Sequence, residues 1–234
     1  MSTPQTLDEI PDSPGWIYAR ALRAAADTLI TEIGEGPSFL LSNLRYSLGV
    51  VVGTPDRQLL QQALNAQSGP VRLLTTLEDS AVVASALPDW RSMTAIVHTL
   101  GADGLLVADA RHSVDILPLH EVLGQPGWPS DVAEELARGD HNALAAVAFV
   151  DSHPASVCYV AFETEAFWDV SIETLEPHRR RGLAESCAVR LIQEMHRRGK
   201  MPVWGAEVQN VPSLRLAWKL GFVPAERLAL FTRA

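Results

Sequence analysis

Apolar positions in the second half of the chain change their period several times, and each change predicts a new element of secondary structure. Three β-rich segments follow one another closely, at residues 144–151, 156–164 and 167–175. The short Ser-His-Pro connection between the first two predicts an antiparallel meander. Over residues 183–195, apolar side chains recur at spacings of three and four, which is the pattern of a helix with one buried face.

Further elements complete this half of the chain. Residues 203–208 predict a strand. A helix then follows between Asn210, a good N-cap residue, and Gly221, which can end a helix in the left-handed conformation. Residues 227–232 predict the last strand. The region therefore alternates strands with helices after its meander, which is typical of an α/β domain.

Residues 1–139 show a weaker alternation of the same kind. A helix is expected over residues 14–34, and another over 54–66 with Thr54 as its cap. Asp131 and Glu134 are spaced to form a capping box in a short helix, within an otherwise loop-rich stretch over 115–139. The remaining expected elements are strands over residues 44–53, 70–76, 93–100 and 105–108 and a helix over 79–86.

Composition limits the class of protein. Hydrophobic residues make up 47% of the chain and charged residues 20%, which is ordinary for a globular protein able to bury a core. The net charge of −9 argues against nucleic acid as the main partner, and no apolar run is long enough to span a membrane. The N-terminus lacks the pattern of a secretory signal, and Cys158 and Cys187 lie in apolar-patterned segments as reduced core thiols would. We therefore expect a cytoplasmic protein, and the spacing of its histidines gives no reason to expect a metal.

The stretch Pro-His-Arg-Arg-Arg-Gly-Leu-Ala, residues 177–184, lies between the meander and the long helix. A helix N-terminus presents unpaired backbone N–H groups and the positive end of the helix dipole, and arginines beside it add charge. Residues 178–200 carry six arginines and one lysine against two glutamates, in a chain that is acidic as a whole. The stretch predicts a site for a small anion that carries phosphate, although a solvated basic turn would have the same composition.

Two motifs in this region resemble those of the GNAT superfamily of acyltransferases. Residues 179–184 fit the pattern Gln/Arg-x-x-Gly-x-Gly/Ala of the loop that binds the pyrophosphate of acyl-CoA. Residues 210–222 look like the second GNAT signature, whose usual form is Asn-x-x-Ala-x-x-Leu-Tyr-x-x-x-Gly-Phe. The order of elements between the motifs also matches, and the resemblance is specific from about residue 144 onward.

The resemblance implies a fold, an acyl donor and a set of contacts. The fold would be α/β, of the α+β type, with a mixed and mostly antiparallel GNAT sheet over residues 91–234. Residues 1–90 would form an additional α/β region, and a degenerate second GNAT-like half is the alternative for them, although the sequence shows no clear internal repeat. The donor would be acetyl-CoA, used without a metal. The implied contacts are Ile172, Glu173 and Thr174 for the pantetheine arm, Arg179, Arg180, Arg181, Gly182, Leu183 and Ala184 for the pyrophosphate, and Asn210 and Ser213 from the second motif.

Acyl transfer from a thioester to an amine requires a base for the amine and a proton for the leaving thiolate. Glu173 is the first candidate for the base, because it lies beside the expected thioester position. Asp169 shares its strand face by period-two alternation, and Glu207 on the next strand is a third candidate. The tyrosine that usually supplies the proton in the family corresponds to Ala217 here, so another group or water would have to supply it.

The sequence thus predicts an N-acyltransferase that moves an acetyl group from acetyl-CoA directly to an amine of a small molecule or peptide. Two alternatives stay open. One is a non-catalytic acyl-CoA sensor with the same fold, suggested by the missing tyrosine, and the other is an interaction protein whose basic turn binds a different anion. The acidic chain favours a cationic acceptor. Neither a nucleic-acid nor a membrane partner is expected, and a homodimer stays open.

Overall fold

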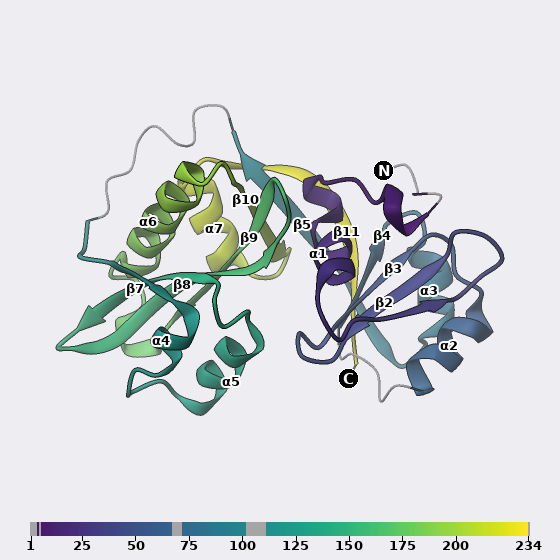
Figure 1. Ribbon diagram of the computed structural model, residues 1–234, viewed down its shortest axis with the longest axis horizontal. Coiled ribbons are helices and arrows are strands. Elements are labelled where there is room, and N and C mark those ends of the chain that lie inside the picture. The colour runs from purple at the N-terminus through teal and green to yellow at the C-terminus, as the bar shows by residue number, and fades with distance from the viewer. Residues whose placement is uncertain (1–3, 5, 67–71, 102–110, 234) are drawn as a thin grey trace. The chain divides into compact units, whose positions relative to one another are not determined.

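The computed structural model describes the chain except for residues 1–3, 5, 67–71, 102–110 and 234 (Figure 1). The chain forms two compact units. The first unit comprises residues 1–97, 206–210 and 225–234, and the second comprises residues 98–205 and 211–224. The chain therefore returns to the first unit twice after leaving it.

The first unit contains a sheet with helices on both faces. Its sheet has the strand order β1-β2-β3-β4-β11, in which only the β3–β4 pair is parallel. The apolar residues of α2 and α3 pack with those of β3, β4 and β11 in one buried cluster. The elements in chain order are α1 (Ile17–Ala24), β1 (Leu29–Glu32), β2 (Phe39–Asn43), β3 (Leu48–Val52), α2 (Arg57–Ala66), β4 (Arg72–Thr76), α3 (Ser80–Ala86) and β5 (Trp90–Leu100), whose last residues lie in the second unit.

The second unit is built in the same way. Its strands follow the order β10-β9-β8-β7-β6, and only the β9–β10 pair is parallel. Figure 1 shows α6 and α7 on one side of this sheet and α4 and α5 on the other. The elements are β6 (Asp115–Pro118), α4 (Leu119–Leu123), α5 (Ser130–Arg138), β7 (Leu144–Val150), β8 (His153–Glu163), β9 (Phe167–Thr174), α6 (Leu183–Arg197), β10 (Met201–Glu207), α7 (Val211–Lys219) and β11 (Phe222–Arg233), whose C-terminal half lies in the first unit.

The two units repeat one order of elements. In each, three antiparallel strands are followed by a helix, a strand parallel to the third, a second helix and a further strand. The first copy is β1-β2-β3-α2-β4-α3-β5, and the second is β7-β8-β9-α6-β10-α7-β11. This repeat is present in the topology although no internal repeat is visible in the sequence. The predicted fold class, a mixed and mostly antiparallel GNAT-type sheet, is confirmed.

The predicted meander and the helices after it are confirmed, with small shifts at their ends. β7, β8 and β9 pair antiparallel, and α6 and α7 occupy the two predicted helical segments. The turn between β7 and β8 is tighter than expected, because Asp151 and Ser152 both adopt positive φ angles and His153 already belongs to β8. β10 begins two residues early, and β11 is a strand of twelve residues.

The prediction of one helix over residues 14–34 is wrong. The helix ends at Ala24, the backbone turns at Asp27 with φ of 61°, and Leu29–Glu32 pairs antiparallel with β2 as a strand. Asn43 on β2 holds this turn, because its side-chain amide donates hydrogen bonds to the Ala26 carbonyl and the Thr28 hydroxyl. The apolar period of three and four in this segment continues by chance into an exposed strand.

Other expectations for the first 139 residues also need correction. Asp56, rather than Thr54, caps α2. Asp131 lies in the first turn of α5 without a side-chain capping bond, so the expected capping box does not form. The segment 115–139 contains β6 and α4, which were not predicted, and β2 was missed as well. The strand expected over 105–108 lies outside the described residues.

Candidate functional site

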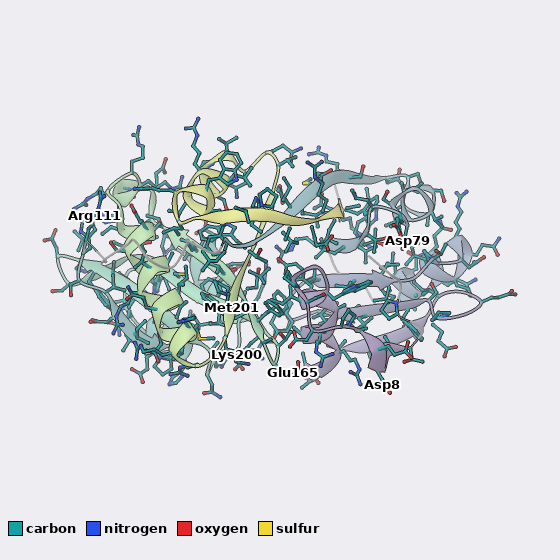
Figure 2. The ribbon with its side chains drawn as sticks, turned by 90° about the horizontal axis from the view of Figure 1, so that it is seen from above. Asp8, Asp79, Arg111, Glu165, Lys200 and Met201 are labelled. Atoms are coloured by element: carbon teal, nitrogen blue, oxygen red, sulfur yellow. The ribbon has the colours of Figure 1, made fainter. Side chains whose placement is uncertain are left out.

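The parallel pair β9–β10 is closed at its beginning and open at its end. Figure 2 shows Glu165, Lys200 and Met201 together in the region where the two strands begin. There the Lys200 ammonium donates to the Thr164 carbonyl, and the Met201 N–H donates to the Ala166 carbonyl at 2.8 Å. The ladder covers only three residue pairs, from Phe167 opposite Met201 to Asp169 opposite Val203. The last five residues of β9 therefore have no ladder partner on the β10 side, and a cleft between splayed strands is the usual result of this geometry.

Eight residues, 175–182, connect the open end of β9 to α6, and their backbone is shaped to receive an anion. Arg180 has φ of 61° and Gly182 has φ of 81°, both in the left-handed region. Residues that alternate between right- and left-handed conformations turn successive N–H groups toward one point. Gly182 is the N-cap of α6 and has no side chain with which to cap it, so the first N–H groups of the helix stay available.

The arginines of the turn have different partners. The Arg179 Nε donates to the Thr174 carbonyl at 3.2 Å, which links the turn to the end of β9. An Arg181 Nη1 donates to the His178 Nδ1 at 2.8 Å. The side chain of Arg180 is exposed and makes no hydrogen bond or ion pair with the described part of the chain. The turn therefore combines directed backbone donors with at least one guanidinium that is available to a ligand.

Glu173 lies on β9 shortly before this turn and is half-buried. Burial raises the pKa of its carboxyl above the ordinary value of 4.5. The carboxylate of Glu135 on α5 raises this pKa further, the Arg179 guanidinium lowers it, and Asp131 on α5 raises it. The net shift is upward, so Glu173 holds a proton at a higher pH than an exposed glutamate would.

The side chains beside Glu173 on the same face are polar and acidic. β8 and β9 pair with Val157 opposite Glu173 and Tyr159 opposite Ser171, so these residues share the face that α4 and α5 cover. The Tyr159 hydroxyl bonds to the Ser171 side chain, and burial raises the pKa of that hydroxyl far above its usual value. Asp169 is buried farther back on the same strand. The expected period-two placement of Asp169 and Glu173 is thus present in the fold.

The other predicted residues are distributed between the units. Ser213 on α7 lies in the second unit, where its Oγ accepts a hydrogen bond from the Trp204 indole at 2.9 Å. This bond anchors α7 on β10. Glu207 and Asn210 fall among the residues of the first unit, with Glu207 half-buried and Asn210 exposed. Within the second unit, the fold therefore brings together residues 172–174, residues 179–184 and Asp169.

Sequence reasoning missed two contacts at the turn. The backbone N–H groups of Arg111 and His112 both donate to the Ser186 hydroxyl in the first turn of α6, at 3.1 and 3.3 Å. The His112 Nε2 also lies 2.9 Å from the Arg181 carbonyl oxygen. Arg111 and His112 carry no local motif and precede the turn by about seventy residues, so only the fold could reveal the contact. A further pair, Lys219 to Glu185 at 2.5 Å, links the start of α6 to the end of α7.

The corresponding place in the first unit is closed by side chains. The β3–β4 ladder also covers three residue pairs, Leu48–Val50 with Arg72–Leu74. Just beyond it, the buried Asp79 carboxylate accepts hydrogen bonds from the hydroxyls of Thr54 at 2.6 Å and Thr76 at 2.7 Å. Asp79 is labelled in Figure 2. These two bonds tie the ends of the two strands together.

The helix start in the first unit is occupied as well. Only four residues, 53–56, connect β3 to α2. Asp56 Oδ1 accepts from the N–H groups of Gln58 at 2.8 Å and Leu59 at 3.0 Å, and Pro55 has no N–H to offer. The backbone of Gly53, with φ of 79°, packs so closely on the Pro37 carbonyl that a Cβ there would lie 2.2 Å from its oxygen. The first unit therefore offers no open helix start at this position.

Other chemistry is weakly supported by the described residues. Burial raises the pKa of the Cys187 thiol to about 12 and raises that of Cys158 as well, so neither is a reactive thiolate at neutral pH. No group of three or more potential metal-ligating side chains occurs among the described residues. None of the helices in the described part of the chain is long and apolar enough to cross a membrane.

Comparison with known proteins agrees with this geometry. Residues 134–231 match a family model described as GNAT acetyltransferase. Among solved structures, a GCN5-related N-acetyltransferase-like protein from Streptococcus suis is similar, with 23% identity and a TM-score of 0.73 over 96% of this chain and 95% of that one. A GCN5-related N-acetyltransferase from Kribbella flavida has 14% identity and a TM-score of 0.65 over 93% of each chain.

A third similar structure is a tandem GNAT protein from the clavulanic acid biosynthesis pathway, with 16% identity and a TM-score of 0.54 over 92% of this chain and 86% of that one. None of the curated proteins matches the sequence significantly. At these identities the structures establish the fold alone. The GNAT superfamily resemblance predicted from the two sequence motifs is confirmed.

Proposed function

We propose that this protein is an N-acyltransferase that transfers an acetyl group from acetyl-CoA to an amine. The observation that carries the proposal is the open end of β9–β10 followed by the uncapped start of α6 at Gly182. A sheet cleft with free backbone groups can hold an extended arm, and a helix N-terminus can hold a diphosphate. Both binding features occur in the order that the acyl-CoA molecule requires.

The donor would lie along the second unit. The backbone of residues 172–174 would pair with the pantetheine arm, and the N–H groups of residues 179–184 would bind the diphosphate. Arg180 supplies an exposed positive charge there. Ser213 would act indirectly, by holding α7 against β10 through its bond to Trp204.

Glu173 would act as the base. A half-buried carboxylate with a raised pKa is a better proton acceptor than an exposed one, because its ionised form is less stabilised by water. It would take the proton as the amine nitrogen attacks the thioester carbonyl carbon. Collapse of the tetrahedral adduct then breaks the carbon–sulfur bond and releases an amide and CoA thiolate, which takes a proton from solvent. Asp169 and Glu207 are the other candidates, and the burial of Asp169 makes it the less accessible of the two.

A non-catalytic acyl-CoA sensor is the second candidate function, and Ala217 is the observation that favours it. Ala217 on α7 corresponds to the usual tyrosine of the family and is completely buried. A tyrosine side chain at this position would overpack the core. The loss of the acid is therefore built into the packing of α7, as would be expected in a protein released from catalysis.

We further propose that the first unit is a second GNAT-like half without a donor site. Its repeated order of elements supports this origin, and the tandem GNAT structure offers a precedent for two such halves in one chain. Asp79 closes the position of the cleft, and Asp56 occupies the helix start. Each chain should accordingly bind one acetyl-CoA.

Calorimetric titration and thermal unfolding with acetyl-CoA test these proposals. At a ligand concentration of a hundred times Kd, the native state should gain about 2.7 kcal/mol. The melting temperature should therefore rise by roughly 5–10 °C in a chain of this size. Inorganic pyrophosphate is the control: stabilisation by pyrophosphate equal to that by acetyl-CoA would favour the general anion-binding protein.

An amine panel with detection of free CoA thiol then separates enzyme from sensor. Release of CoA that depends on one class of amine supports the acyltransferase. Tight acetyl-CoA binding with no release on a broad panel of amines would favour the sensor instead. Two molecules of acetyl-CoA bound per chain would contradict the proposal for the first unit.

A further inference from the structure

The segment Arg111–His112 forms one wall of the arginine turn, although the sequence gives no sign of it. Both of its backbone N–H groups donate to the buried Ser186 hydroxyl, at the fourth residue of α6. Figure 2 labels Arg111 beside this helix. A segment from a distant part of the chain is thereby fixed against the first turn of the helix that we expect to bind the diphosphate.

From this position the His112 ring reaches the backbone of the turn. Its Nε2 lies 2.9 Å from the Arg181 carbonyl oxygen. A carbonyl oxygen can only accept, so Nε2 carries the proton and donates it. A Cβ built on Gly182 would lie 3.5 Å from the same nitrogen, which shows how closely the ring approaches the N-cap of α6.

This hydrogen bond determines the direction of an amide. The peptide group that joins Arg181 to Gly182 is planar and trans, so its C=O and N–H point in opposite directions. Holding the Arg181 oxygen toward His112 therefore turns the Gly182 N–H away from the ring and toward the opposite side of the turn. The peptide lies between two residues with positive φ, Arg180 and Gly182, where the backbone has unfavourable alternatives to this arrangement.

We propose that His112 is a positioning residue of the donor site, which orients the Gly182 N–H for the diphosphate of acetyl-CoA. The inference rests on the proposed function, because it concerns the same site. His112 would not touch the reacting atoms. Its effect would be to organise the backbone donors before the ligand arrives, which strengthens binding by removing the cost of ordering them.

Binding of acetyl-CoA to the free protein, measured by calorimetry, tests the proposal. His112→Ala should weaken binding by roughly three- to ten-fold, the usual effect of one lost hydrogen bond. His112→Gln should restore most of the affinity, since a glutamine amide can donate to the same carbonyl. His120→Ala is the matched control, because the exposed His120 ring also bonds a backbone carbonyl, that of His141 at 2.9 Å, on α4.

A backbone measurement separates positioning from general stability. The amide proton resonance of Gly182 should shift downfield on addition of acetyl-CoA in the wild type and in His112→Gln, and shift much less in His112→Ala. Equal affinity and equal Gly182 shifts in wild type and His112→Ala would overturn the proposal. So would an equal loss of affinity in His120→Ala. If the wild type itself fails to bind acetyl-CoA, the proposed function fails, and this inference fails with it.

Discussion

The two parallel strand pairs of this protein, β3–β4 and β9–β10, have the same ladder length and different open ends. Each ladder covers three residue pairs, and each third strand is followed by a helix. At β3–β4, the Asp79 carboxylate ties the strands together and Asp56 caps the helix. At β9–β10, the ladder simply stops, and the helix begins at Gly182 without a side-chain cap.

The difference shows that topology supplies a place for a ligand, and a few residues decide whether it is used. Eight connecting residues in the second unit allow an arginine-rich turn with two left-handed positions, whereas four in the first unit allow only a tight turn. A carboxylate at a helix N-terminus satisfies the same N–H groups that a phosphate would need. The first unit has therefore placed its own anion where the second unit can accept one from outside.

The largest expected effect concerns Glu173, for which the first unit has no carboxylate counterpart. The residue four positions after the last ladder pair is Glu173 in the second unit and Thr54 in the first. Glu173→Gln should lower turnover by roughly 10²–10⁴-fold, the usual contribution of a positioned base. Acetyl-CoA affinity, measured by calorimetry, should be unchanged, because the strand backbone rather than this side chain is proposed to contact the donor. The acid limb of the rate profile should lie above pH 4.5 in the wild type and disappear in the variant.

Stability as a function of pH serves as the control for folding of this variant. The pKa of Glu173 is raised in the folded protein, so its neutral form favours the native state and this contribution is lost as pH rises through the folded pKa. Glutamine stays neutral throughout. Glu173→Gln should therefore melt at a higher temperature than the wild type at pH 7–8, and the gain should vanish below the unfolded value of about 4.5. Unchanged turnover in the variant would transfer the role to Glu207, Asp169 or water.

A smaller effect is expected from blocking the open helix start. Gly182→Val would place a branched side chain over the N–H groups at the start of α6 and should weaken acetyl-CoA binding by about 10- to 100-fold, the effect of losing one hydrogen bond to a charged group. Gly199→Val is the matched control, since Gly199 at the other end of α6 has a similar φ of 76° and open space around it. Both variants should lose about 1–2 kcal/mol of stability through the left-handed backbone. Equal affinities in the two variants would contradict the assignment of the turn.

The smallest effect should come from opening the first unit. Asp79→Ala removes the acceptor for the hydroxyls of Thr54 and Thr76, and the unsatisfied groups should cost about 1–3 kcal/mol, a fall of several degrees in melting temperature. The affinity for acetyl-CoA should stay at the wild-type value, because this unit lacks an arginine turn. Asp89→Ala, at an exposed position near the end of α3, is the control with little expected change. A change in acetyl-CoA affinity in Asp79→Ala would break the comparison between the units.

The sequence by itself determined the second unit well because its signals are local. The period of apolar residues identified the meander and α6, and the spacing of arginine and glycine residues identified the turn, since each depends on neighbours along the chain. The same reasoning failed over residues 14–34. There the side chain of Asn43, many residues later, holds a turn after Ala24 that an apolar period of three and four had hidden.

Only the tertiary structure decided how the two halves differ and what surrounds the turn. The repeat of elements in the first unit is a property of strand pairing, which leaves no fixed spacing in the sequence. The closure by Asp79 depends on strands that end side by side. The raised pKa of Glu173 depends on carboxylates of α5, and the Arg181 carbonyl meets His112 across 69 positions of the chain. Burial and long-range hydrogen bonds are set by the folded packing, so residue types and local spacing could not reveal them.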